Sequence, residues 1–141
     1  MRFPRAGATL LLALIGVVCA AGAKKKPDSD ARLKNIHSIF IAGNNPTAIN
    51  ARADVTDERF VRRLKICFSV AEKPDQADAT LEISEVPAPS KVYADSMNAS
   101  GSLTLRTGEL IWSFTPPFPE DVANLRATFL VSALRRAVCG N

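Results

Sequence analysis

The stretch CFSVAEKPDQADATLEISEV, residues 67–86, decides the fold because it holds a clear strand pattern. Its last eight residues, ATLEISEV, alternate apolar and polar side chains, with Ala79, Leu81 and Ile83 on one side. Strict alternation predicts a β-strand with one buried and one solvated face. CFSVA predicts a shorter strand, and EKPDQA between the two has the proline and aspartate of a turn. The stretch therefore predicts two strands joined by a turn.

The same alternation continues towards the carboxyl end. In MNASGSLTLR, residues 97–106, and LIWSF, residues 110–114, alternate residues face a core, and TGE between them supplies a reversal at Gly108. Leu110, Trp112 and Phe114 are predicted to lie on the buried face. Gly101 is expected to mark a bulge or a close backbone approach. The pattern predicts an antiparallel meander with a single buried face.

Upstream, NIHSIFIAG, residues 35–43, predicts the first strand, with apolar residues on both faces as in a central strand covered on two sides. The next stretch predicts a helix from about Pro46 to Lys65, with Asn45 as its cap. A break between Asp54 and Asp57 is the alternative, because DVTDE can cap a second, shorter helix.

The last 26 residues predict a second helix. Glu120 and Asp121 are expected in its first turn, with Arg135 and Arg136 in its last turn and Gly140 as the cap. One wide apolar face is predicted to lie on the sheet; it consists of Val122, Leu125, Phe129, Ala133 and Ala137, widened by Leu130, Leu134 and Val138. The fold class is therefore α+β, in the order strand, helix, strands, helix, with a mixed sheet, an antiparallel meander and two helices packed on one face.

The amino-terminal residues 1–23 have the features of a secretory signal peptide. Two arginines precede an apolar run that ends in small residues, and that run is shorter than the roughly 20 residues of a membrane-spanning helix. Cleavage is expected after Ala23, followed by a polar tether over residues 24–33 and a single domain over residues 34–141. Lipid attachment at Cys19 is not expected, because Val18 stands where a small residue is usual. The protein is predicted to be periplasmic or secreted, with no transmembrane segment in the mature chain.

The positive charge of the chain lies in its amino-terminal part. The formal net charge is +4, but from Leu33 onward Lys and Arg number twelve and so do Asp and Glu. A nucleic-acid-binding domain needs a basic footprint, so this function is excluded for the folded part.

Two cysteines, Cys67 and Cys139, remain after removal of the leader. In an exported domain such a pair predicts a disulfide. A metal or redox site would need a CxxC motif or a set of His and Cys residues, and the sequence has neither, so no metal and no cofactor is expected.

Candidate catalytic groups are sparse, and no catalytic residue is assigned. His37, the sole histidine, lies in the first predicted strand and is expected to be packed and hydrogen-bonded. Asp78 and Glu82 are explained by a turn and a solvated strand face, while Glu85 falls in the buried register. Residues 87–96, PAPSKVYADS, join two strands by more residues than a hairpin needs. They are either a proline-stiffened connector or a binding loop, whose candidate residues are Lys91, Val92 and Tyr93.

The order of elements around residues 67–86 resembles a known group. A helix, a short F-x-V strand, a polar turn and ADA-x-L-x-I, followed by the GELIWSF hairpin, are similar to the small bacterial envelope domains of the TolB amino-terminal and CsgG/LpoB-like type. The likeness covers most of residues 34–138. It implies non-catalytic assembly or partner binding in the bacterial envelope. The chain departs from that group in its cysteine pair and its lack of pore-forming hairpins.

The sequence predicts an exported, non-catalytic module that binds a protein or envelope component through a sheet edge or through residues 87–96. Two alternatives stay open. One is a small secreted hydrolase using Glu82, Asp78 or His37. The other is a secreted inhibitor or effector that acts through residues 87–96.

Overall fold

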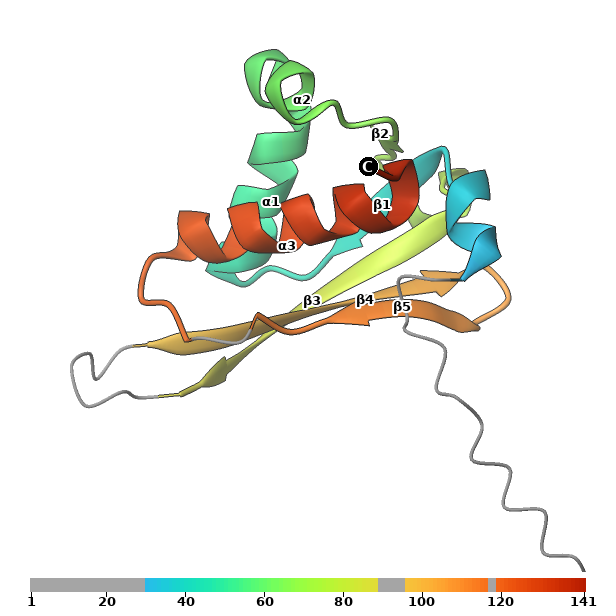
Figure 1. Cartoon of the computed structure of the whole chain (residues 1–141). Coiled ribbons are helices and arrows are strands. Elements are labelled where there is room, and N and C mark those ends of the chain that lie inside the picture. The colour runs from blue at the N-terminus through green and yellow to red at the C-terminus, as the bar shows by residue number, and fades with distance from the viewer. Residues whose placement is uncertain (1–29, 89–95, 117–118) are drawn as a thin grey trace, which may run out of the picture.

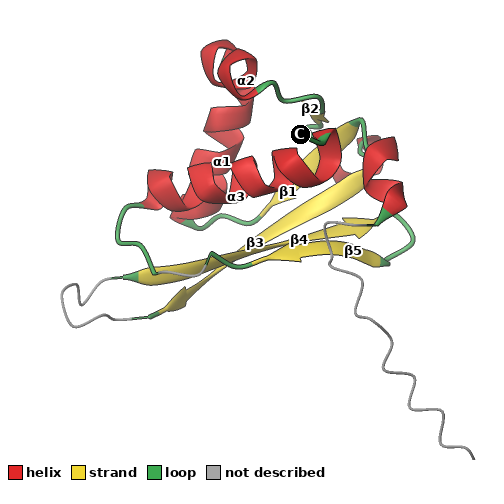
Figure 2. Ribbon diagram, viewed as in Figure 1, coloured by secondary structure: helices red, strands yellow, loops and turns green. Residues whose placement is uncertain are grey.

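The computed structural model describes residues 30–88, 96–116 and 119–141, and these residues form an α+β fold (Figures 1 and 2). One mixed sheet has the strand order β2-β1-β3-β4-β5, and the helices lie on one of its faces. The predicted fold class is confirmed. The elements in chain order are η2 (Ala31–Asn35), β1 (Ser38–Ala42), α1 (Pro46–Thr56), α2 (Glu58–Leu64), β2 (Ser69–Val70), η3 (Pro74–Gln76), β3 (Ala79–Pro87), β4 (Met97–Leu105), β5 (Leu110–Phe114) and α3 (Ala123–Cys139).

The sheet combines a parallel half with an antiparallel half. β1 runs parallel to both β2 and β3, whereas β3, β4 and β5 form the predicted antiparallel meander. The prediction of a first strand covered on both sides is wrong. Ile39 and Ile41 are buried, whereas Phe40, which alternates with them, lies on the other face of the sheet and is only half-buried.

Strand β5 departs from the predicted alternation. The pairing of β4 with β5 shifts between Leu103 and Thr104, so that Leu103 lies opposite Trp112 and Thr104 lies opposite Leu110. Ile111 is the extra residue of this β-bulge, and it is buried. Leu110, which was predicted to be buried, is 57% exposed. Trp112 keeps its predicted place in the core, while Phe114 is half-buried.

The first predicted helix is broken, as the alternative interpretation expected. Asp57 ends α1 and begins α2: its carboxylate accepts the backbone N–H groups of Arg59 and Phe60 at 2.8 and 3.3 Å. Asn45 caps α1 as predicted, accepting from the N–H of Ala48. An Asx cap satisfies the free N–H groups of a helix start, so DVTDE encodes a second start.

Helix α3 presents a different face to the sheet from the one predicted. Val122, Leu125 and Phe129 are 44%, 42% and 49% exposed, whereas Arg126 is buried. The predicted stripe is therefore wrong in its first half. The buried face consists of Arg126, Ala127, Leu130, Val131, Ala133, Leu134 and Val138. Glu120 and Asp121 also lie before the helix rather than in its first turn, where Glu120 accepts the N–H groups of the two following residues.

The physical reason for this rotation is a buried ion pair between α3 and β3. Arg126 contacts Glu85 at 3.1 Å, and the two side chains are only 5% and 8% exposed. Arg126 also donates to the hydroxyl of Thr47 at 2.9 Å and to the carbonyl of Glu120 at 2.7 Å. The carboxylate of Glu85 accepts the N–H and the hydroxyl of Thr47, at the start of α1. Buried charges persist only when they are paired and hydrogen-bonded, and this network meets that condition.

The network also decides the protonation of Glu85. Burial of its carboxyl raises the pKa, whereas the hydrogen bonds from Thr47 and the charge of Arg126 lower it. The lowering is larger, so the pKa of Glu85 lies below its ordinary value. Glu85 therefore stays ionised at neutral pH.

Gly101 lets α3 approach the sheet closely. A Cβ atom at this position would lie 3.3 Å from Leu130 and 3.4 Å from both Leu81 and Trp112. The sequence predicted a bulge or a close backbone approach here; the structure instead brings three side chains against Gly101. The side chains of α3 and β5 can therefore meet directly above β4.

The disulfide between Cys67 and Cys139 is confirmed, with a Cα–Cα distance of 5.7 Å. It joins the residues just before β2 to the last residue of α3. Gly140 ends the helix with a φ of 78°, as predicted for a carboxyl-terminal cap. At the other end of the domain, Leu33 in η2 is fully buried, so ordered structure includes residues 31–33, which the sequence assigned to the tether. The predicted signal peptide and Cys19 lie outside the described residues.

No described helix has both the length and the apolar character needed to cross a membrane.

Loss of the disulfide is expected to destabilise the fold. The two cysteines are 72 residues apart, so the cross-link restricts the unfolded chain by about 4 kcal/mol in the chain-entropy model. The double substitution Cys67→Ala and Cys139→Ala should lower the free energy of unfolding by about this amount in urea titrations. Reduction of the unmodified protein should cause the same shift, and an unchanged midpoint after reduction would contradict the structural role.

Breaking the buried ion pair is expected to cost more than replacing it. Arg126→Met leaves the Glu85 carboxylate buried and unpaired, which should cost about 3–5 kcal/mol, while Glu85→Leu combined with Arg126→Met should recover most of the loss. Urea unfolding of both variants measures this, with the exposed Arg62→Met on α2 as control.

Because the pKa of Glu85 is lowered, its contribution to the free energy of unfolding is present above the ordinary value of 4.5 and is lost as the pH falls below it. The double variant should lack this acid dependence, and equal loss in single and double variants would refute the pair's role.

Candidate functional site

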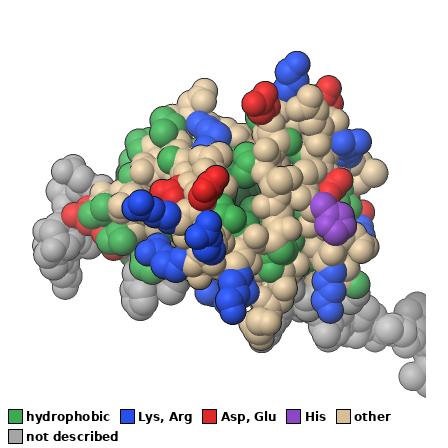
Figure 3. All heavy atoms as spheres, turned by 90° about the horizontal axis from the view of Figure 1, so that it is seen from above, with side chains coloured by type: hydrophobic (Ala, Val, Ile, Leu, Met, Phe, Trp, Pro, Cys, Tyr) green, Lys and Arg blue, Asp and Glu red, His purple; other side chains and the backbone are tan. Residues whose placement is uncertain are grey.

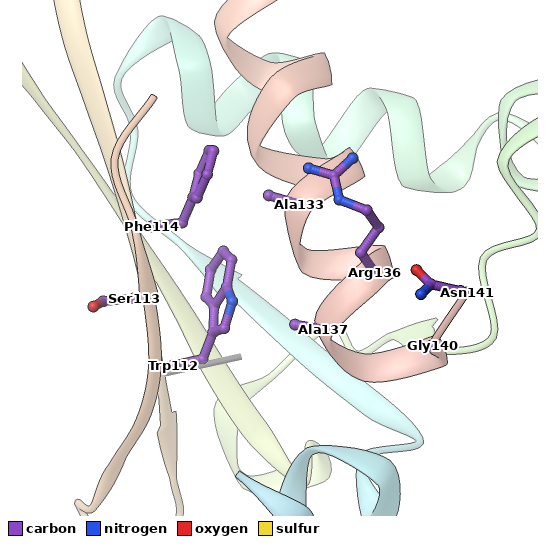
Figure 4. A pocket seen from close by; sticks show the side chains of 8 residues that line it. All are labelled: Trp112, Ser113, Phe114, Ala133, Arg136, Ala137, Gly140 and Asn141. Atoms are coloured by element: carbon purple, nitrogen blue, oxygen red, sulfur yellow. The ribbon is translucent and has the colours of Figure 1, made fainter. Parts of the chain in front are cut away.

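A groove lies between the edge strand β5 and the last turns of α3 (Figure 4). It has a volume of about 480 Å³. Its floor is aromatic and its helical wall is made of small residues, with one arginine above them. The lining residues are Trp112, Ser113, Phe114, Ala133, Arg136, Ala137, Gly140 and Asn141. This groove is the candidate functional site.

Two stacked aromatic rings form the floor of the groove. The ring centroids of Trp112 and Phe114 are 6.0 Å apart, with an angle of 14° between the planes. Figure 4 shows both rings on the side of β5 that faces α3, while Ser113 points away from the helix. The β-bulge places these rings, because it resets the register just before Trp112.

Trp112 has an unused hydrogen-bond donor. Its side chain is only 2% exposed, and its indole N–H donates to no group among the described residues; the nitrogen is not among the fully buried atoms without a partner, so it is reached from the groove. In Figure 4 the indole nitrogen lies on the edge of the ring that faces α3. A buried tryptophan N–H usually finds a partner. The groove therefore offers a free donor at its floor.

Arg136 adds a free positive charge to the groove. It is exposed in the last turn of α3 and forms no ion pair with any carboxylate in the described part of the chain. Its neighbour Arg135 differs, because that side chain donates to the carbonyl of Gly140 at 2.8 Å. The sequence assigned both arginines only to the helix dipole. In the structure, Arg135 caps the end of α3, whereas Arg136 has no ion-pair partner among the described residues.

The groove opens along an unpaired sheet edge. Within the described residues, β5 pairs with β4 alone, so its other side presents free backbone N–H and C=O groups.

Val122, Leu125 and Phe129 recur every three or four residues and fall on the same side of α3 as Ala133 and Arg136. Figure 3 shows apolar side chains on the surface at the end of the helical layer where α3 begins. We call Val122, Leu125 and Phe129, which are all exposed, the outer stripe.

The candidate catalytic residues are not assembled into a site. His37 is exposed at the start of β1, where Figure 3 shows it in purple, so the prediction of a packed histidine is wrong. It lies outside the buried core because the alternation of β1 turns Ile39 and Ile41 inward. Asp78 lies near it, but its carboxylate accepts the backbone N–H groups of His37 and Ser38 at 2.8 and 3.1 Å.

The carboxylate of Asp78 therefore fixes the backbone of His37 and Ser38 rather than binding a substrate. The hydrogen bond from the N–H of His37 is the main cause that lowers the pKa of Asp78. Glu82 is exposed on the bare face of the sheet, as its alternation predicted, and Glu85 belongs to the buried network. No group of three or more His, Cys, Asp or Glu side chains that could hold a metal ion occurs in the described ranges. Lys91, Val92 and Tyr93, the predicted binding residues, lie outside the described residues.

Sequence reasoning missed the groove because it placed the whole outer stripe in the core. One signal was present in the sequence: Arg126 lies beside Leu130 and Leu134 on the helix, and Glu85 was already in the buried register. An opposite charge on each of two buried faces indicates a pair between them, and that pair fixes which face of α3 is left exposed.

Comparisons of the chain with protein-family models, with curated proteins and with solved structures found no match.

The roles of Asp78 and His37 can be separated by stability. Asp78→Ala should destabilise the fold by about 1–2 kcal/mol because two backbone N–H groups lose a charged acceptor, while His37→Ala should leave stability almost unchanged. Since the pKa of Asp78 is lowered, its contribution is present above the ordinary value of 3.8 and is lost at lower pH. Urea titrations at neutral and acid pH measure both effects. Equal losses in the two variants would contradict this separation.

Proposed function

We propose that this protein is an exported, non-catalytic module that binds a segment of a partner protein along β5. The single observation that carries the proposal is the unpaired edge of β5, which borders a groove with an aromatic floor. Extended peptides recognise such edges by adding a strand, with backbone hydrogen bonds for affinity and side-chain pockets for specificity.

The surroundings of β5 support binding rather than a solvated edge. Proteins usually protect an edge strand with charges, prolines or a covering loop. The sequence LIWSF of β5 contains neither a charge nor a proline, and Leu110 at its start is 57% exposed. The outer stripe adds Phe129 on α3, which is 49% exposed. Together with the aromatic floor of the groove, these exposed apolar side chains favour an interaction site around β5.

The exported location is supported by the character of the chain. Residues 1–23 have the pattern of a signal peptide, and the disulfide suits an oxidising compartment. The resemblance to small bacterial envelope domains, made at the level of element order, agrees with a role in assembly or partner binding there. No observation on the described residues favours the hydrolase, because His37 and the nearby carboxylate do not converge on a cavity.

Site-specific photo-crosslinking tests the proposal. A photoreactive phenylalanine analogue replaces Phe129 in the outer stripe or Leu110 on β5, and the tagged protein is produced in its native compartment. Both positions should yield one discrete adduct with the same protein, because Leu110 lies on β5 itself and Phe129 lies one helical turn before Ala133 of the groove.

The matched control carries the analogue at Arg62 on α2, which is exposed but remote from β5. It should give no such adduct. Adducts of equal yield from the analogue at position 62, or no adduct from the analogue at positions 129 and 110, would contradict the proposal.

A further inference from the structure

We propose that the groove recognises an extended peptide segment in which an acidic side chain and an apolar side chain lie two residues apart. This inference rests on the proposed function and specifies the chemistry of the partner. The acid binds Arg136 and the indole N–H of Trp112, and the apolar side chain occupies the space above Phe114 between β5 and α3.

The two donors define the acid. Arg136 is exposed and forms no ion pair among the described residues, and the N–H of Trp112 is open to the groove and has no acceptor there. Both groups line the same groove, and both can only donate. A carboxylate has two acceptor oxygens and a negative charge, so it satisfies both donors at once. No Asp or Glu side chain lines the groove to compete with it.

The wall of the groove defines the apolar neighbour. Ala133 and Ala137 are small, and they leave space opposite the rings of Phe114 and Trp112. An apolar side chain in this space buries surface against two aromatic rings, which are strong contributors at interfaces.

The spacing follows from strand geometry. On a peptide that pairs with β5, alternate side chains point towards the helical layer, and residues two apart lie about 6.6–6.8 Å from each other. Trp112 and Phe114 are likewise two residues apart along β5, and Figure 4 shows both rings on the side that faces α3. The two peptide side chains therefore match the two floor positions, in the order apolar, any residue, acid or its reverse according to the strand direction.

A second copy of this chain fits the groove less well. Pairing β5 with β5 around Trp112 would bring two Arg136 side chains to one symmetry axis. No acid of the groove lies between them, since the lining contains no Asp or Glu. Like charges brought together at an interface oppose association.

Peptide selection followed by binding measurements tests the inference. The purified, oxidised protein is used to select from a random heptapeptide library displayed on phage with no free peptide carboxyl terminus. The recovered sequences are synthesised with blocked ends, and binding is followed by the fluorescence of Trp112, the only tryptophan of the chain. Selected peptides should share an apolar residue and an acid two positions apart.

Substitutions in the protein and in the peptide should identify the groups that contact each other. Arg136→Gln, or replacement of the peptide's acid by its amide, should weaken binding about 10-fold or more, and binding should weaken at high salt. Trp112→Phe, followed by calorimetry, keeps a ring and removes the N–H, so it should weaken binding about 3-fold to 10-fold. Arg136→Lys should retain part of the affinity. The control Arg62→Gln should change it less than about 2-fold.

Two sets of results separate this inference from the proposed function. Selected peptides without an acid, peptides that need a free carboxyl terminus, or binding unaffected by Arg136→Gln would overturn the inference, as would a purified dimer held through β5. The proposed function would survive each of these if Phe129 still yields its adduct. Failure to select any peptide together with failure of the crosslink would overturn both.

Discussion

The buried pair between Arg126 and Glu85 is the interaction on which the arrangement of this domain depends. It joins the start of α3 to the far end of β3, and through Thr47 it also holds the start of α1. An arginine is expensive to bury, so it imposes one rotation on the helix that carries it. Leu130 and Leu134 then face the sheet, and Leu125 and Phe129 cannot. The exposed outer stripe is the consequence of a polar contact rather than of apolar packing.

The second consequence concerns the edge of the sheet. With α3 held in this rotation, small residues lie above β5, and the β-bulge turns Trp112 and Phe114 towards them. The disulfide at Cys139 anchors the last turn of the same helix, next to Arg136. Both ends of α3 are therefore fixed, one by charge and one by a covalent link. A groove between a fixed helix and an edge strand is preformed, and a preformed site loses less entropy on binding.

The sequence predicted the elements that follow from local chemistry. Strand alternation in β3 and β4, the caps at Asn45 and Gly140, the break at Asp57 and the pairing of Cys67 with Cys139 all depend on residues read one segment at a time. The errors arose where two segments decide the outcome together. The orientation of α3 depends on Glu85, which is 41 residues away from Arg126, and the exposure of Leu110 depends on a bulge in its pairing with β4. Helical periodicity alone made Leu125 and Leu130 equally suitable for the core. The groove could not be predicted because its position follows from that orientation.

The orientation of α3 is the central claim, and hydroxyl-radical footprinting of the unmodified protein tests it most directly. Side-chain oxidation read by mass spectrometry reports which residues of one helix are open to water. We expect strong oxidation at Phe129 and Leu125 and protection at Leu130 and Leu134, with the protection lost on unfolding in urea. Protection of Phe129 and Leu125 in the free monomer, with Leu130 or Leu134 oxidised instead, would show that the apolar stripe faces the sheet and would contradict the account.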